Sequence, residues 1–421
     1  MATTVTSETP NITRQRIDSI DLLRGIVMVI MMLDHTRDFV YIQGLFGDPT
    51  DLRTTTTALF LTRWITHFCA PVFVFLAGTG AYLQSSRGKS KRELSRFLVT
   101  RGLWLIVLEC TLVRLGAFFA FDYRLVGFFQ VIWVIGASMI VLAGLIHLPL
   151  KLIGGFGLVM IAFHNFLDRF QVQSWQGPGS PVPSVGAKVW MLLHQQGGFP
   201  VLGFPSPVVI VIYPLIPWVG VMAVGYAFGA FYQMEAQRRR RLLLVIGGIV
   251  TAGFVSMRFA NFYGDPARWS PQKNAVFTML SFLNTTKYPP SLLFLLMTLG
   301  PAIAALAWFE TRGRISNPTT LFGRLRNALV TYGRVPLFFY LLQWPTAHLI
   351  SVLLHLAAGK PVRWLFMSPL ELFSNRPPEG IGFNLAVVYA AWITGVLLLY
   401  PLCKWFAGVK ARRRDWWLSY L

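Results

Sequence analysis

The sequence predicts an all-α protein, a polytopic bundle of about ten transmembrane helices with both termini in the cytoplasm. Of its 421 residues, 54% are hydrophobic and only 13% are charged, and the mean hydropathy is +0.54. A soluble chain would have about a quarter of its residues charged. Apolar windows of about 20 residues, long enough to span a bilayer, recur along the whole chain. The lipid-exposed parts must be helical, because unpaired backbone polar groups are not tolerated in hydrocarbon.

Polar or basic stretches separate the apolar segments and divide the chain into spans. We expect a cytoplasmic N-terminal tail at 1–16, one transmembrane domain at 17–410 and a cytoplasmic C-terminal tail at 411–421. The ten spans are predicted at 22–42, 60–84, 98–118, 126–147, 151–167, 207–232, 242–260, 289–309, 334–356 and 383–407.

The distribution of lysine and arginine predicts the orientation. With the N-terminus inside, the inner segments hold 23 basic residues and the outer segments hold 11. Cytoplasmic loops carry an excess of basic residues, so this bias favours cytoplasmic termini. Two outer loops, 168–206 and 261–274, are long and rich in Gly, Pro or aromatic residues, which is typical of substrate-binding loops as well as of plain connections.

The formal charge of +21 does not indicate nucleic-acid binding, because the basic residues lie between the spans and form no single patch. The three cysteines, Cys69, Cys110 and Cys403, are scattered through apolar runs and favour neither a disulfide framework nor a zinc site. No histidine pair has a metal-ligand spacing, so we expect no metal centre.

The first span has a polar stripe on one helical face. Ionisable groups inside a span cost at least about 2.5 kcal/mol each and usually face a bundle interior or an aqueous cavity. The stripe has spacings of three and four residues and consists of Asp21, Arg24, Met28, Met31, His35 and Asp38.

His35 is the member of this stripe that is suited to proton transfer near neutral pH. Asp38 lies one turn further along the same face and could orient its ring, whereas Asp34 points elsewhere and should pair with Arg37. The alternative is that His35 is an ordinary interfacial residue at the helix end. His67, near the outer end of the second span, is open to the same two interpretations. Pro71, Gly78 and Gly80 in that span predict close helix contact or a bend.

Five segments of the chain resemble bacterial members of the heparan-alpha-glucosaminide N-acetyltransferase catalytic-domain family, and the resemblance covers nearly the whole chain. They are 17-IDSIDLLRGIVMVIMMLDHTRDF-39, 66-THFCAPVFVFLAGTGAYL-83, 213-YPLIPWVGVMAVGYAFG-229, 287-KYPPSLLFLLMTLG-300 and 332-YGRVPLFFYLL-342.

The first hundred residues also resemble the integral-membrane sugar O-acyltransferases. That family has a D-x-L-R-G/A pattern with a His fourteen residues after the Asp, which Asp21 and His35 match here. The animal lysosomal enzyme of the first family instead has its catalytic His in a luminal stretch before the second span. The corresponding segment here, 44–57, contains no His, so the assignment of a catalytic role to His35 follows the second family.

The two resemblances imply a multi-pass protein of the bacterial inner membrane that transfers an acyl group, usually acetyl, from cytoplasmic acetyl-CoA to an acceptor on the far side. The acceptor would be a carbohydrate hydroxyl or amine. His35 would be the general base, assisted by Asp38 and Asp34, and an acyl-His intermediate is also chemically allowed. The expected partners are membrane lipid, acyl-CoA and the acceptor, and the sequence leaves oligomerisation, including a homodimer, open.

Cationic side chains are needed for the phosphates of acetyl-CoA, and polar or aromatic side chains of the outer segments are needed for a sugar. The donor candidates are Arg24, Arg92, Arg96 and Arg101. The acceptor candidates are His67, Asp265, Trp269, Lys287 and Tyr288.

Two rival interpretations remain at this level. Asp34, His35 and Asp38 could form the relay of a proton-coupled transporter or exporter. The chain could also be a membrane scaffold without enzymatic activity, in which every polar residue named above would tolerate substitution.

Overall fold

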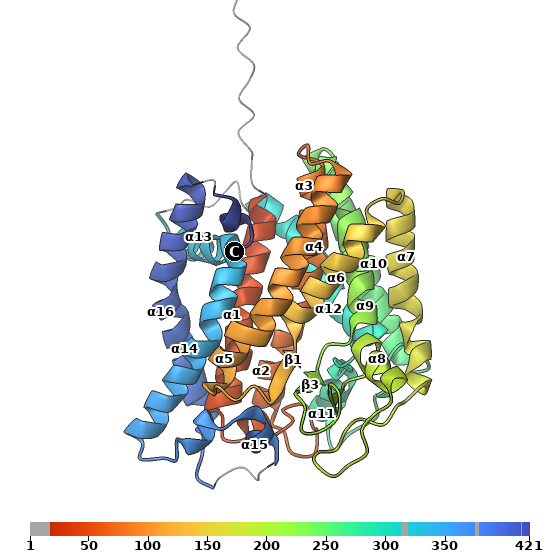
Figure 1. The fold of residues 1–421 in the computed structure, drawn as a ribbon. Helices are drawn as coiled ribbons and strands as arrows, with labels where there is room; N and C mark the ends of the chain where they lie inside the picture. The colour runs from red at the N-terminus through yellow and green to blue at the C-terminus, as the bar shows by residue number, and fades with distance from the viewer. Residues whose placement is uncertain (1–16, 313–318, 375–378, 414) are drawn as a thin grey trace, which may run out of the picture.

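The protein is a bundle of long helices that run between two ends of the molecule (Figure 1). The computed structural model describes residues 17–312, 319–374, 379–413 and 415–421. The predicted N-terminal tail, 1–16, lies outside the described residues.

Most of the described chain is helical. The longer helices are α1 (Asp18–Val40), α3 (Cys69–Ser85), α4 (Lys91–Leu108), α6 (Val131–Leu145), α7 (Leu150–Phe163), α9 (Leu215–Phe228), α10 (Ala236–Ala260), α12 (Leu292–Arg312), α13 (Leu321–Arg334), α14 (Pro336–Ala357) and α16 (Leu385–Arg412). The shorter helices are α2 (Thr57–Ile65), α5 (Arg114–Phe118), α8 (Val185–Leu193), α11 (Ala275–Leu283) and α15 (Pro369–Ser374). A π-helical segment, Glu109–Val113, joins α4 to α5.

The prediction of an all-α chain misses a small sheet. Its strands are β1 (Leu125–Phe129), β2 (Gly197–Pro200) and β3 (Val208–Val211), in the order β1-β3-β2. β1 is parallel to β3, and β2 is antiparallel to it. β1 and β3 stand where the predicted spans 126–147 and 207–232 begin, because a short apolar run looks the same in a buried strand and in a helix.

Seven helical segments among the described residues are long and apolar enough to cross a membrane. These segments are Thr57–Ser85, Leu150–Arg169, Leu215–Gln233, Ala236–Ala260, Leu292–Glu310, Pro336–Ala357 and Leu385–Arg412. The other three predicted spans also fall on helices: α6, an apolar helix of 15 residues, and α1 and α4, which carry several charged side chains. An α-helical membrane bundle is therefore supported, whereas the number of ten spans stays a prediction.

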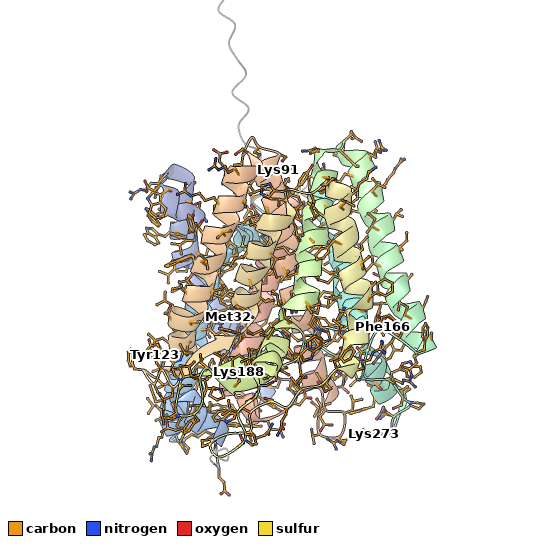
Figure 2. All side chains as sticks on the ribbon, turned by 45° about the vertical axis from the view of Figure 1, so that its right-hand side comes forward. Met32, Lys91, Tyr123, Phe166, Lys188 and Lys273 are labelled. Atoms are coloured by element: carbon orange, nitrogen blue, oxygen red, sulfur yellow. The ribbon has the colours of Figure 1, made fainter. Side chains whose placement is uncertain are left out.

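The two ends of the bundle match the predicted division into inner and outer segments. Lys91 lies at the end opposite Lys188 and Lys273 (Figure 2). The start of α1 and the C-terminal residues lie together at the first of these ends (Figure 1). We call the end with Lys91 the inner end and the other the outer end; that the inner end faces the cytoplasm stays a prediction.

Close helix crossings fix α1 and α3 within the core. A Cβ atom added at Gly78 of α3 would overlap the Met222 carbonyl of α9, so the predicted close contact at Gly78 is confirmed. A Cβ atom at Gly25 of α1 would likewise overlap the Leu329 carbonyl of α13. Backbones approach this closely only where the side chain is absent. α1 thereby lies among α12, α13, α14 and α16, with its polar stripe inside the bundle.

Candidate functional site

α1 is one unbroken helix, so the predicted stripe exists as one face. Asp18 and Asp21 stand in its first turn and Arg37 in its last, where each sign complements the helix dipole. Met28, Met31 and His35 of the stripe are all buried. The stripe therefore faces neighbouring helices along its length.

The His35 ring lies inside the bundle and packs on a tryptophan. It is 9% exposed, and its centroid lies 3.7 Å from that of Trp344 on α14, with 34° between the ring planes. Nδ1 of His35 is 3.9 Å from Oδ2 of Asp38, which is beyond hydrogen-bond distance. Within the described part of the chain this nitrogen has no hydrogen-bond partner. The ring is therefore buried against α14 and not exposed at the surface of the bundle.

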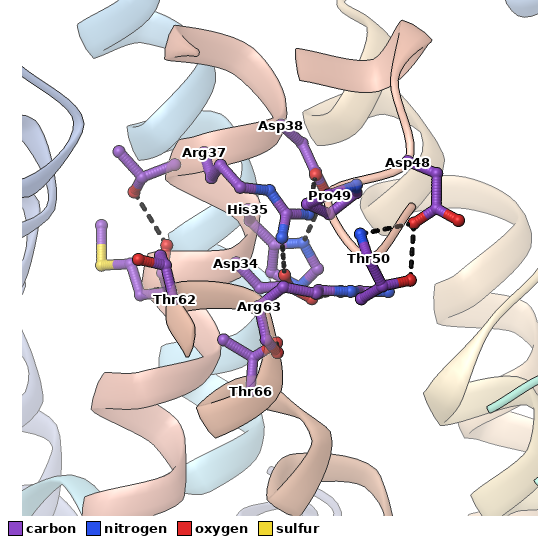
Figure 3. A network of polar contacts seen from close by, with 12 residues as sticks. Asp34, His35, Arg37, Asp38, Asp48, Pro49, Thr50, Thr62, Arg63 and Thr66 are labelled. Carbon is purple, nitrogen blue, oxygen red and sulfur yellow. Dashed lines mark hydrogen bonds and ion pairs between the residues drawn. The ribbon is translucent and has the colours of Figure 1, made fainter. Parts of the chain in front are cut away.

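The charged side chains beside His35 form one network (Figure 3). Arg37 binds Asp34 at 3.0 Å and Asp38 at 2.5 Å, so the predicted pairing of Asp34 with Arg37 is confirmed. Arg63 of α2 is a second cation at Asp34, to which it donates a hydrogen bond, and it also donates to the hydroxyl of Tyr288 at 3.4 Å. Arg63 was counted among the basic residues of the outer segments and was not a candidate site residue, because its contact with Asp34 joins segments far apart in the chain.

A cavity of about 690 Å³ lies toward the outer end of the bundle, and the residues of this network form part of its wall. Asp34, Arg63, His67 and Trp344 line it together with Lys287 and Tyr288. Three of the five predicted acceptor residues, His67, Lys287 and Tyr288, are therefore brought to one cavity.

The remaining two acceptor candidates do not line this cavity. Both carboxylate oxygens of Asp265 accept hydrogen bonds, from Ala267 in its own loop and from Thr286 and Ser291 in the segment between α11 and α12. Trp269 donates its indole N–H to the Arg258 carbonyl at 2.7 Å. Both side chains hold the outer loop together.

A second cavity, of about 450 Å³, lies on the inner side. Basic side chains among its lining residues are Arg24, Arg87, Arg101, Arg334 and Lys410. Arg24 lies 3.7 Å from Asp21 and donates to the Leu76 carbonyl, and Arg101 donates to the Ser419 carbonyl. Arg92 and Arg96 are exposed and are not among the described lining residues. Two of the four predicted donor arginines thus reach the cavity.

The two cavities approach each other around His35. On α1, Met31 lines the inner cavity and Asp34 the outer one; on α14, Tyr340 lines the inner cavity and Trp344 the outer one. These pairs are three and four residues apart, which is about one helical turn or roughly 4.5–6 Å along the axis. His35 is not among the described residues that line either cavity, but it follows Asp34 on α1 and packs on Trp344, which both line the outer cavity.

Glu109 is a further buried polar residue that the sequence analysis did not single out. It is 1% exposed, its Oε2 accepts the backbone N–H of Trp133 at 2.9 Å, and its Oε1 has no hydrogen-bond partner among the described residues. An acidic residue inside the predicted span 98–118 was the available signal. Its contact with Trp133 holds the N-terminus of α6 beside the inner cavity.

No group of three or more His, Cys, Asp or Glu side chains in the described ranges is placed to bind a metal ion.

Comparison with known proteins adds the family. Among curated proteins, none matches the chain. The family model described as heparan-alpha-glucosaminide N-acetyltransferase, catalytic, matches residues 16–263, which is more than half of the chain and includes the whole polar stripe of α1. Members of this family are acetyltransferases that in general use acetyl-CoA as donor. This chain belongs to the heparan-alpha-glucosaminide N-acetyltransferase catalytic-domain family.

Proposed function

We propose that this protein transfers an acetyl group from acetyl-CoA in the inner cavity to a carbohydrate hydroxyl or amine in the outer cavity, with His35 as general base. The observation that carries the proposal is a pair of cavities, one toward each end, whose linings come within about one helical turn of each other on α1 and α14, beside the buried His35. A transferase that works across a membrane needs access for one substrate from each side and a shared reaction point.

The basic side chains of the inner cavity suit the negative charge of the donor. Coenzyme A carries several phosphate charges, and guanidinium groups bind phosphate by charge-assisted hydrogen bonds. Arg24 and Arg101 line the cavity, with Arg334 and Lys410. The wall deeper in the cavity is apolar, with Met28, Met31 and Leu105, which suits a pantetheine arm more than a phosphate.

In the proposed reaction, the acceptor oxygen or nitrogen attacks the thioester carbonyl carbon while His35 takes the acceptor proton. The carbon–sulfur bond then breaks, and the coenzyme A thiolate recovers a proton from the imidazolium. A free nitrogen on His35 is what a base requires, and Nδ1 has no hydrogen-bond partner among the described residues. The same nitrogen could instead take the acetyl group first and form an acyl-His intermediate.

Asp34 and Asp38 support this chemistry in different ways. Asp34 is held by Arg37 and Arg63, so it shapes the outer cavity and takes no proton while those ion pairs persist. Asp38 is the carboxylate nearest to Nδ1 of His35, and a small rotation would place it to hold the charged imidazolium.

Acetyl transfer by purified protein in lipid vesicles, with acetyl-CoA on one side and a panel of sugars on the other, tests the proposal. His35→Ala should lower the rate about 10²- to 10⁴-fold, the usual value of general-base assistance. Calorimetric binding of acetyl-CoA by this variant should stay at the wild-type level. The control is His147→Ala, since His147 is exposed and lines neither cavity.

Wild-type protein that binds no acetyl-CoA would overturn the proposal. Sugar flux through sealed vesicles without acetyl-CoA would favour the transporter instead, with Asp34, His35 and Asp38 as its relay.

A further inference from the structure

Lys287 is a buried lysine at the outer cavity. It lies in the segment between α11 and α12, pairs through the backbone with Pro290 and is 9% exposed. Asp265 fixes this segment, because it accepts hydrogen bonds from the backbone and hydroxyl of Thr286 and from the hydroxyl of Ser291. The side chain of Lys287 is thus held at the cavity wall by a well-bonded loop.

The carboxylates that line the cavity are engaged by groups other than Lys287. Asp34 and Asp38 pair with Arg37 and Arg63, and Asp48 accepts hydrogen bonds from the backbone and hydroxyl of Thr50. Lys287 forms no ion pair within 4.0 Å with a carboxylate of the described residues, and its ammonium nitrogen lies 5.2 Å from the centre of the Tyr288 ring. An ammonium group taken out of water without a counter-charge is costly, so such a group usually meets an anion in the functional state.

A second unsatisfied group lines the same cavity. His67 is 2% exposed, and its Nδ1 has no hydrogen-bond partner in the described part of the chain. In the tautomer protonated at Nδ1, this group is a hydrogen-bond donor. Lys287 and His67 come from segments more than 200 positions apart and line the same cavity. An oxyanion there could accept hydrogen bonds from both the ammonium group and the Nδ1–H group.

We infer that Lys287 and His67 form an anion-binding subsite, and that the acceptor is a sugar carrying a carboxylate or a phosphate group. The identification of the bound sugar as the acceptor rests on the proposed function. The subsite would bind the anionic group and leave the reacting hydroxyl or amine toward His35.

Calorimetry on the purified full-length protein without acetyl-CoA tests the subsite by itself. The probes are glucose, glucuronate and glucose 1-phosphate. Wild-type protein should bind at least one anionic probe more tightly than glucose; preference for glucuronate identifies a carboxylate and preference for glucose 1-phosphate identifies a phosphate. Lys287→Met should weaken binding of the anionic probe about tenfold or more, because it removes the charged hydrogen-bond donor of the subsite.

Two variants make the test specific. Lys287→Arg keeps the charge and should retain much of the binding. Lys273→Met is the matched control, because Lys273 is an exposed lysine that packs on the Phe277 ring outside the cavity. Inorganic phosphate should compete with the anionic probe on wild-type protein, a measurement that needs no variant.

The inference is overturned by equal binding of glucose and both anionic probes, by wild-type affinity in Lys287→Met, or by a lack of competition from phosphate. Because no acetyl-CoA is present, these outcomes are independent of acetyl transfer. A protein that transfers acetyl groups yet shows no anion preference would lose the subsite and keep the proposed function.

Discussion

His35 on α1 and Trp344 on α14 lie with 3.7 Å between their ring centroids and 34° between their ring planes. The indole ring forms part of the outer cavity wall, and Tyr340, one turn away on the same helix, lines the inner cavity. Trp344 therefore contacts the proposed base and stands on the side of the outer cavity that is nearest to the inner one.

Replacement of Trp344 should uncouple these two roles. Trp344→Ala is expected to lower sugar acetylation about 100-fold, because a displacement of about 1 Å at a reacting group has an effect of that size. Hydrolysis of acetyl-CoA by water should rise relative to transfer, since the wall between the cavities is thinned. The ratio of free acetate to acetylated sugar measures this. Trp405→Ala serves as control, because Trp405 is 60% exposed on α16; an unchanged ratio in Trp344→Ala would contradict the role of the indole as a barrier.

Loss of Arg63 should destabilise the protein. Asp34 would keep Arg37 but lose its second cation inside the bundle, and removal of one partner from a buried pair costs about 3 kcal/mol. Arg63→Met should therefore lower the apparent midpoint of thermal unfolding in detergent by several degrees. Arg53→Met should not, because the Arg53 side chain is 88% exposed.

The double variant Arg63→Met, Asp34→Asn separates charge from packing. Arg37 would still have Asp38, so the pair of substitutions should cost less than the sum of the two single ones. Strict additivity would show that Arg63 acts through its packing alone.

The inner cavity distinguishes among the arginines that were candidates for donor binding. Arg101 lines the cavity, whereas Arg92 is exposed at the start of α4 and does not. Arg101→Ala should raise the dissociation constant of acetyl-CoA about tenfold, the loss expected for one charge-assisted hydrogen bond. Arg92→Ala should leave it unchanged. Equal effects of the two variants in calorimetry would point to general surface charge and away from a defined site.

The parts of the fold that sequence reasoning predicted are those with local causes. Each predicted span contains a helix, because a run of about 20 apolar residues has few other stable forms in lipid. The pairing of Asp34 with Arg37 was predictable from a spacing of three residues on one helix.

The contacts that complete the candidate site are not local. Arg63, Trp344 and Lys287 reach the neighbourhood of Asp34 and His35 from α2, α14 and the segment before α12. No periodicity within a single segment encodes which helices become neighbours. The strands β1 and β3 were missed because their pairing is likewise a contact between distant segments.

The close crossing of α1 and α13 can be tested by comparing a glycine at the crossing with a glycine on an open helix face. Gly333 of α13 lies so close to α1 that an added Cβ atom would overlap the Asp21 carbonyl. Gly333→Ala must push these backbones apart, and overpacking of this kind costs about 1–3 kcal/mol. The displaced segment carries Asp21 and Arg24, so acetyl-CoA binding should weaken and the unfolding midpoint should fall.

The matched control is Gly155 of α7, where an added Cβ atom would have no heavy atom within 4 Å. Gly155→Ala should therefore leave stability unchanged or raise it, since alanine is favoured over glycine within a helix by about 1 kcal/mol. Thermal unfolding and acetyl-CoA calorimetry on both variants decide the matter: if Gly333→Ala behaves like Gly155→Ala, the close crossing does not position the start of the polar stripe.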